Sequence, residues 1–93
     1  MGAYLPEDLV EKLSDICMEK CQTMSQLISD IIAEEIHDLP NVVEEIGIGK
    51  NDKAVNFGPV EPEALGNLIM QAEHFGVSER SVLIACIKRY VQH

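Results

Sequence analysis

The chain has 93 residues, of which 16 are acidic and 7 are Lys or Arg, so its formal net charge is −9. A chain of this length forms one domain that buries roughly 60–65% of the surface exposed by its unfolded state, and a hydrophobic fraction of 46% with no Trp indicates an aliphatic core. The acidic balance repels a phosphate backbone at long range, and three cysteines without a repeated spacing argue against a disulfide framework.

The negative charge is concentrated in the first half of the chain. Residues 1–50 carry three basic and eleven acidic side chains, a net charge of −8, whereas residues 51–93 carry four basic and five acidic ones, a net charge of −1. No apolar run reaches the length of a transmembrane helix, and the N-terminus lacks the basic and apolar regions of a signal peptide. We therefore expect a soluble, cytoplasmic protein without a membrane partner.

Two helices are expected near the N-terminus. Pro6 followed by two acidic residues is typical of a helix start and predicts a helix over 6–20. Thr23 with Gln26 three residues later is typical of a capping box and predicts a helix over 24–37. At helical spacing, one side of this second helix carries Leu27, Ile28, Ile31, Ile32 and Ile36, and the other side carries Ser29, Asp30, Glu34 and Glu35.

Residues 39–52 have the composition of a linker, with Pro40, two glycines and a polar Lys-Asn-Asp segment. The first part fits one helical turn closed by Gly47. Residues 42–48 also fit a strand that turns at the polar segment into the next strand. Both interpretations stay open, because periodicity does not separate them.

A strand and two further helices are expected after the linker. Alternation in KAVNF predicts that Val55 and Phe57 point inward and Asn56 points outward. A helix over 61–75 would place Leu65, Leu68, Ile69 and Ala72 inward. Gly76 ends that helix, and Ser78 caps the last one, over 78–91.

The two halves of the chain repeat each other. A shift of 56 residues aligns 6–36 with 62–92 without a gap. The identical pairs fall at the helix start, the cap and the apolar face: Pro6/Pro62, Glu7/Glu63, Leu9/Leu65, Ser25/Ser81, Leu27/Leu83, Ile28/Ile84 and Ile31/Ile87. Because physical constraints on residue choice are strongest there, the matches predict a structural repeat.

Each half contains an extended segment, a proline-opened helix, a short turn, and a helix that begins near a Ser before an aliphatic run. The segments are YLPEDLVEKLSDICMEKCQTMSQLISDII and VEPEALGNLIMQAEHFGVSERSVLIACIKRY. Both resemble the ribbon-helix-helix family of Arc, MetJ and CopG-type repressors. The resemblance implies a mainly α fold: a tandem ribbon-helix-helix pseudo-dimer with four helices and a short two-stranded antiparallel ribbon. Its core interface would comprise Leu27, Ile28, Ile31, Leu83, Ile84 and Ile87.

In this arrangement the whole chain, 1–93, is a single domain. It consists of a first ribbon-helix-helix repeat at 1–38, a linker at 39–52 and a second repeat at 53–93. The two repeats can pair within one chain, which gives a monomeric pseudo-dimer. A homodimer of full chains is the rival arrangement.

The resemblance also implies a non-enzymatic, DNA-binding transcriptional regulator. In the family, alternate strand side chains read base edges in the major groove, and amides at the start of the second helix hold a phosphate. Asn56 can pair with adenine, while Lys53 and Arg80 can contact phosphates. The first strand offers only Gly2 and Tyr4. The full set of implied DNA-binding residues is Tyr4, Thr23, Ser25, Lys53, Asn56, Ser78 and Arg80.

Simpler roles fit the same residues, since Thr and Ser are common N-caps and an Asn before Gly58 and Pro59 is a common turn residue. The alternative function is an acidic protein-interaction module of the same fold that has lost DNA reading. Its partner would be a basic protein, bound through Glu34, Glu35 and Asp38.

Metal and enzyme chemistry have weaker support in the sequence. Cys17 and Cys21 lie one helical turn apart and suggest a metal site with His37 or His74, although a thiol on a helix is usually a small apolar filler. No catalytic triad or phosphate-binding loop has the required spacing. We expect no enzymatic activity, no metal and no cofactor.

Overall fold

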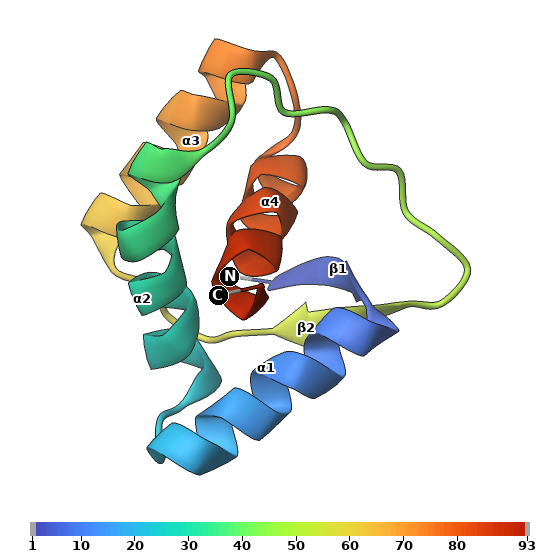
Figure 1. Cartoon of the computed structure of the whole chain (residues 1–93), viewed down its shortest axis with the longest axis vertical. Coiled ribbons are helices and arrows are strands. Elements are labelled where there is room, and N and C mark those ends of the chain that lie inside the picture. The colour runs from blue at the N-terminus through green and yellow to red at the C-terminus, as the bar shows by residue number, and fades with distance from the viewer. Residues whose placement is uncertain (1, 93) are drawn as a thin grey trace.

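The computed structural model describes residues 2–92. In chain order it contains β1 (Gly2–Pro6), α1 (Glu7–Lys20), α2 (Met24–Glu35), the short 3₁₀ helix η1 (Ile36–Asp38), β2 (Asp52–Asn56), α3 (Pro62–Phe75) and α4 (Glu79–Val91) (Figure 1). The prediction of a mainly helical fold with four α-helices and a two-stranded antiparallel ribbon is confirmed. The second helix ends at Glu35, two residues earlier than expected, because the chain tightens into η1.

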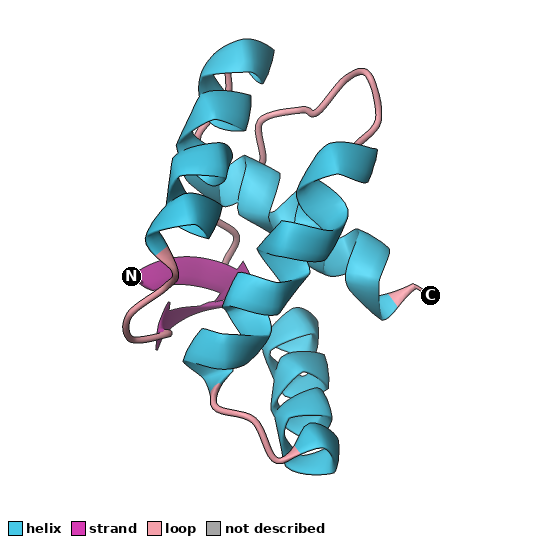
Figure 2. Cartoon of the chain, turned by 90° about the vertical axis from the view of Figure 1, so that its left-hand side faces the viewer, coloured by secondary structure: helices cyan, strands magenta, loops and turns pink. Residues whose placement is uncertain are grey.

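The ribbon joins the two halves of the chain. β1 and β2 are antiparallel, with Ala3 opposite Val55 and Tyr4 opposite Ala54. Figure 2 shows the two strands together at the edge of the helical body. Leu5 is fully buried on the inner face. Because strand side chains alternate between faces, Tyr4 and Ala54 lie on the outer one, where both are exposed.

The core lies between α2 and α4, which pack against each other and against the other elements. The residues of the predicted core interface have no exposed surface: Leu27, Ile28, Ile31, Leu83, Ile84 and Ile87. Leu13 of α1 and Leu68 of α3 are fully buried members of the same cluster. Burial of aliphatic surface, at about 25 cal/mol per Å², is the main force that holds the halves together.

The helix ends repeat at an offset of 55 residues, not 56. Cys21 and Gly76 end α1 and α3 in the left-handed conformation, with φ values of 54° and 69°. Thr23 and Ser78 then cap α2 and α4 with extended backbones. Each pair is 55 positions apart, one residue fewer than the offset that aligns the identical residues.

Burial follows the same offset. Leu13 and Leu68 are 55 positions apart, as are Ile32 and Ile87, and all four are fully buried. The prediction that Ile69 points inward is therefore wrong, since that side chain is 40% exposed. The aliphatic runs in α2 and α4 tolerate a one-residue slip without losing their apolar matches, which is why identity alone misplaced the repeat.

The polar side of α2 is more buried than its pattern indicates. Ser29 was expected at the surface but is only 8% exposed, and its Oγ accepts a hydrogen bond from the Glu61 backbone N–H at 3.2 Å. Glu35 is 6% exposed and pairs with Arg89 at 3.2 Å. Both contacts attach α2 to the second half of the chain.

Residues 39–51 form neither the helical turn nor the strand expected for the linker. They run as an irregular segment from η1 around the end of the molecule to β2 (Figure 1). The segment still packs on the protein, because Val43 is 7% exposed and Ile46 contacts the core. Both expected conformations are therefore wrong, since tertiary contacts and not local pairing hold this segment.

The two strands enter their helices differently. β1 leads straight into α1 at Pro6, whereas residues 57–61 separate β2 from α3. In that connection Phe57 is 3% exposed and Gly58 adopts a φ of 79°, which favours glycine. The Ser25 hydroxyl donates a hydrogen bond to the Pro59 carbonyl, so this connection is held against α2.

Candidate nucleic-acid interface

The outer face of the ribbon carries few groups that can read bases. Tyr4 is 49% exposed, and the methyl group of Ala54 lies opposite it. Asn56 is exposed as expected, but its Oδ1 accepts a hydrogen bond from the Gly58 N–H at 3.0 Å. Pairing with adenine uses both ends of the Asn amide, and the turn already engages one of them.

Lys53 alternates with Ala54 and so lies on the other face of β2, where it forms an ion pair with Glu7 at 3.2 Å. The two side chains are 57% and 46% exposed. An exposed pair of this kind contributes about 0–1 kcal/mol, so the ammonium exchanges readily with another anion.

Arg80 is held inside the protein by three groups from three segments. Its Nε donates to the Tyr4 carbonyl at 2.6 Å, one terminal nitrogen donates to the Ile46 carbonyl, and the other contacts the Asp52 carboxylate at 2.5 Å. The side chains of Arg80 and Asp52 are only 13% and 8% exposed. The guanidinium therefore connects β1, the linker and β2 to α4, at the position where the resemblance implies a phosphate contact.

A carboxylate of the chain itself lies at the N-terminus of α4. Ser78 caps the helix, and its Oγ accepts from the Ser81 N–H at 3.2 Å. The Glu45 carboxylate then accepts from the Ser78 backbone N–H at 2.7 Å and from the Ser78 hydroxyl at 2.9 Å. These bonds, first the one from the backbone N–H and then the one from the hydroxyl, lower the pKa of Glu45. This carboxylate thus occupies the place expected for a DNA phosphate.

The neighbouring linker residue fixes that arrangement. The Ile46 N–H donates to the Ser81 Oγ at 2.9 Å, while its carbonyl accepts from Arg80. Residues 45 and 46 are therefore bound to the first turn of α4 through both side-chain and backbone groups.

The N-terminus of α2 forms the predicted capping box. Thr23 Oγ1 accepts from the Gln26 N–H at 3.2 Å, and Gln26 Oε1 accepts from the Thr23 N–H at 3.3 Å. The Ser25 hydroxyl is bonded to the Pro59 carbonyl. Both implied phosphate-binding side chains of α2 thus have structural partners.

Sequence reasoning missed Glu45 and Asp52 as members of this network. Glu45 lies in the segment 39–52, for which the sequence predicts only a linker. Its partner Ser78 lies 33 residues away, and Asp52 lies 28 residues from Arg80. No local spacing marks contacts of this range, and the one available signal was an acidic linker in a chain with a Ser-capped helix.

The cysteine pair does not form a metal site. Cys17 is partly buried and Cys21 exposed, and no group of three or more His, Cys, Asp or Glu within residues 2–92 is arranged to hold a metal ion. Across the same residues, no helix has the length and apolar character needed to span a membrane.

Comparison with known proteins adds no relative: no protein-family model, no curated protein and no solved structure matches this chain.

Proposed function

We propose that this chain is an acidic protein-interaction module built from two ribbon-helix-helix-like halves that fold on each other as a pseudo-dimer. Three observations support this arrangement. Each half contributes one strand and two helices, the strands pair antiparallel, and the helix ends repeat at a constant offset. The sequence comparisons identify no family, so the proposal is based on these residues and their geometry.

The observation that carries the functional proposal is the Glu45 carboxylate at the start of α4. A helix N-terminus attracts anions, because its free N–H groups and its dipole both favour negative charge. Here the linker supplies that anion, and Arg80 is neutralised by Asp52. A DNA phosphate would have to displace one carboxylate and approach a second.

The remaining charges also favour a basic protein partner over DNA. Of the seven Lys and Arg residues, four are bonded within the chain: Lys20, Lys53, Arg80 and Arg89. DNA affinity depends on cations that release counterions from phosphates. Sixteen acidic side chains against so few available cations favour a basic partner.

DNA binding is the second candidate function, and the ribbon is the observation that favours it. Its outer face exposes Tyr4 and Asn56, and Lys53 on the other face of β2 is held by one exposed ion pair. Antiparallel ribbons of this kind can enter the major groove. On this hypothesis, Glu45 competes with the DNA backbone for the α4 N-terminus.

A gel-shift titration at low ionic strength separates the two candidates. We expect no retarded band with genomic DNA for the wild type, for Glu45→Gln or for the control Glu44→Gln, which removes the same charge from the exposed neighbour. A band that strengthens in Glu45→Gln alone and is lost in Asn56→Ala would overturn the proposal. The mass in solution tests the pseudo-dimer, which we expect to be a monomer.

A further inference from the structure

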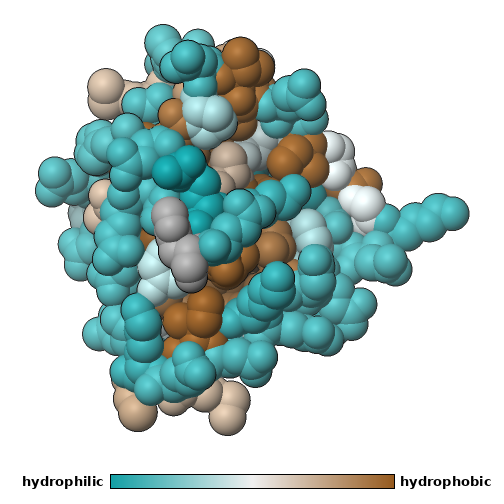
Figure 3. All heavy atoms as spheres, in the orientation of Figure 1, coloured by the Kyte–Doolittle hydropathy of each residue, from teal (hydrophilic) through white to brown (hydrophobic). Residues whose placement is uncertain are grey.

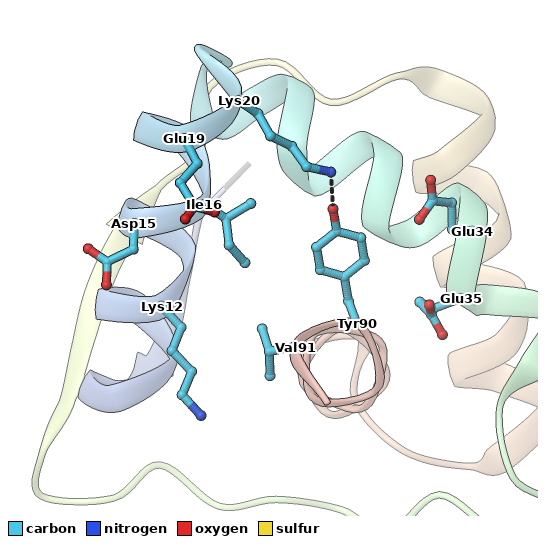
Figure 4. Close-up of a pocket in the computed structure, with 9 residues that line it drawn as sticks. All are labelled: Lys12, Asp15, Ile16, Glu19, Lys20, Glu34, Glu35, Tyr90 and Val91. Atoms are coloured by element: carbon cyan, nitrogen blue, oxygen red, sulfur yellow. Dashed lines mark hydrogen bonds between the residues drawn. The ribbon is translucent and has the colours of Figure 1, made fainter. Parts of the chain in front are cut away.

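An open groove lies where α1, α2 and the C-terminal end of α4 meet (Figure 4). Its volume is about 620 Å³. Ile16, Tyr90 and Val91 line it and are only partly buried against the core. In Figure 4, Ile16 and Val91 point into the space between α1 and α4. The groove thus has an apolar floor that the described part of the chain leaves accessible.

Carboxylates surround this floor on two helices. Asp15 and Glu19 of α1 and Glu34 of α2 line the groove, and none of them forms an ion pair within residues 2–92. Asp15 and Glu19 continue a row begun by Glu7 and Glu11, each four residues from the next. Like charges at this spacing destabilise an isolated helix. Lys53 offsets Glu7 at the start of the row, whereas Asp15 and Glu19 beside the groove can still pair with a cation from outside the chain.

The nearby cations offset the charge of the rim only in part, because the groove is lined by two lysines and by three carboxylates that form no ion pair in the described part of the chain. The Lys20 ammonium donates a hydrogen bond to the Tyr90 hydroxyl at 2.6 Å and lies 5.3 Å from the centre of its ring. Arg89 is paired with Glu35. Lys12 is the other basic side chain that lines the groove, and it lies one helical turn from Asp15 on α1. On the face in Figure 3, hydrophilic side chains likewise surround smaller hydrophobic areas.

We infer that this groove binds a basic amphipathic segment of a partner protein. An aliphatic side chain of that segment would cover Ile16 and Val91, and its Lys or Arg residues would reach Glu19 and Glu34. Helices with apolar side chains three and four residues apart bind grooves in this way. The inference rests on the proposed function and names the site and the class of partner.

The probe is a short fluorescent peptide of Leu and Lys, with Leu at helical spacing, and its matched control carries Glu in place of Lys. The test variant is Glu19→Lys with Glu34→Lys. Its control, Glu63→Lys with Glu73→Lys, makes the same charge change at exposed positions of α3. At low ionic strength we expect the test variant to lose about tenfold or more in affinity for the Lys peptide, and the control variant much less.

Two further readouts locate the site. NMR shifts induced by the Lys peptide should centre on Ile16, Tyr90 and Val91. Val91→Ser, at the last residue of α4, should lower affinity several-fold without a change of charge. If circular dichroism shows that the charge-reversed test variant is unfolded, Val91→Ser replaces it as the test of the groove.

The outcomes distinguish this inference from the proposed function. Equal weakening by both charge reversals, or unchanged affinity in Val91→Ser, would show that the groove is not the site, while the acidic surface still binds basic partners. If the Lys peptide does not bind the folded protein, the inference that this groove is a binding site is also refuted. A specific DNA complex in the gel shift would instead overturn the proposed function.

Discussion

Replacing Arg80 with Met should destabilise the fold, because this side chain joins three segments to α4. The change keeps most of the aliphatic stem but removes the guanidinium and all of its hydrogen-bond donors. It deprives the Tyr4 and Ile46 carbonyls of a hydrogen bond and leaves Asp52 without its cation. The Asp52 carboxylate retains one bond, from the Gly49 N–H at 3.0 Å.

The magnitude follows from burial. Removing one partner of a buried ion pair costs about 3–5 kcal/mol, because the other charge is left uncompensated. The Asp52 side chain is 8% exposed, and the Gly49 N–H still solvates it, so we expect about 2–4 kcal/mol. A chain of this length has a total stability of about 5–14 kcal/mol. The loss would lower the melting temperature by about 10–30 °C.

Urea unfolding followed by circular dichroism measures this effect, and Lys53→Met is the matched control. Lys53 is the other cation assigned to DNA contact, but its pair with Glu7 is exposed, so its loss should cost less than about 1 kcal/mol. A double-mutant cycle with Asp52→Asn isolates the coupling of the buried pair. If Arg80→Met costs no more than Lys53→Met, the reasoning that makes Arg80 a structural link is refuted.

Three other changes test the core, the linker and the thiols. Either Ile31→Ala or Ile87→Ala should lower the free energy of unfolding in urea by about 2–5 kcal/mol, since both side chains are fully buried. A decrease of less than about 1 kcal/mol would mean that the α2–α4 contact is loose. Because the pKa of Glu45 is lowered from 4.5 on folding, its stabilising effect is present above pH 4.5 and is lost as the pH falls through the folded pKa. Glu45→Gln should therefore weaken the acid dependence of the urea midpoint, and an unchanged profile would contradict the contact with α4. Burial raises the pKa of Cys86 to about 12. At pH 8 a thiol reagent should therefore modify exposed Cys21 and leave Cys86 unreacted until the protein unfolds. Early modification of Cys86 would show that α4 is not packed as described.

The helices and their ends could be predicted from the sequence because their signals are local. Thr23 and Gln26 are three residues apart, so the capping box follows from spacing alone. Gly76 is the residue that most easily adopts the left-handed conformation that ends α3. The buried faces of α2 and α4 likewise follow from aliphatic periodicity within each helix.

The register between the halves was decided by tertiary packing. Identities favoured an offset of 56 residues and helical periodicity placed Ile69 in the core, but burial and capping follow an offset of 55 and leave Ile69 exposed. Aliphatic side chains are interchangeable enough that a run of them does not specify which member faces the partner helix. Packing specifies it, because only one rotation of each helix fills the space between them.

The candidate site depended most on the tertiary structure. Arg80 bonds to a carbonyl 76 positions away and Glu45 to a serine 33 positions away. A sequence shows which side chains can donate or accept, but every exposed Glu competes for the same helix ends and cations. Backbone carbonyls such as those of Tyr4 and Ile46 carry no sequence signature at all. The choice among these partners is made by the path of the linker, whose energy depends on contacts that form only when the two halves have come together.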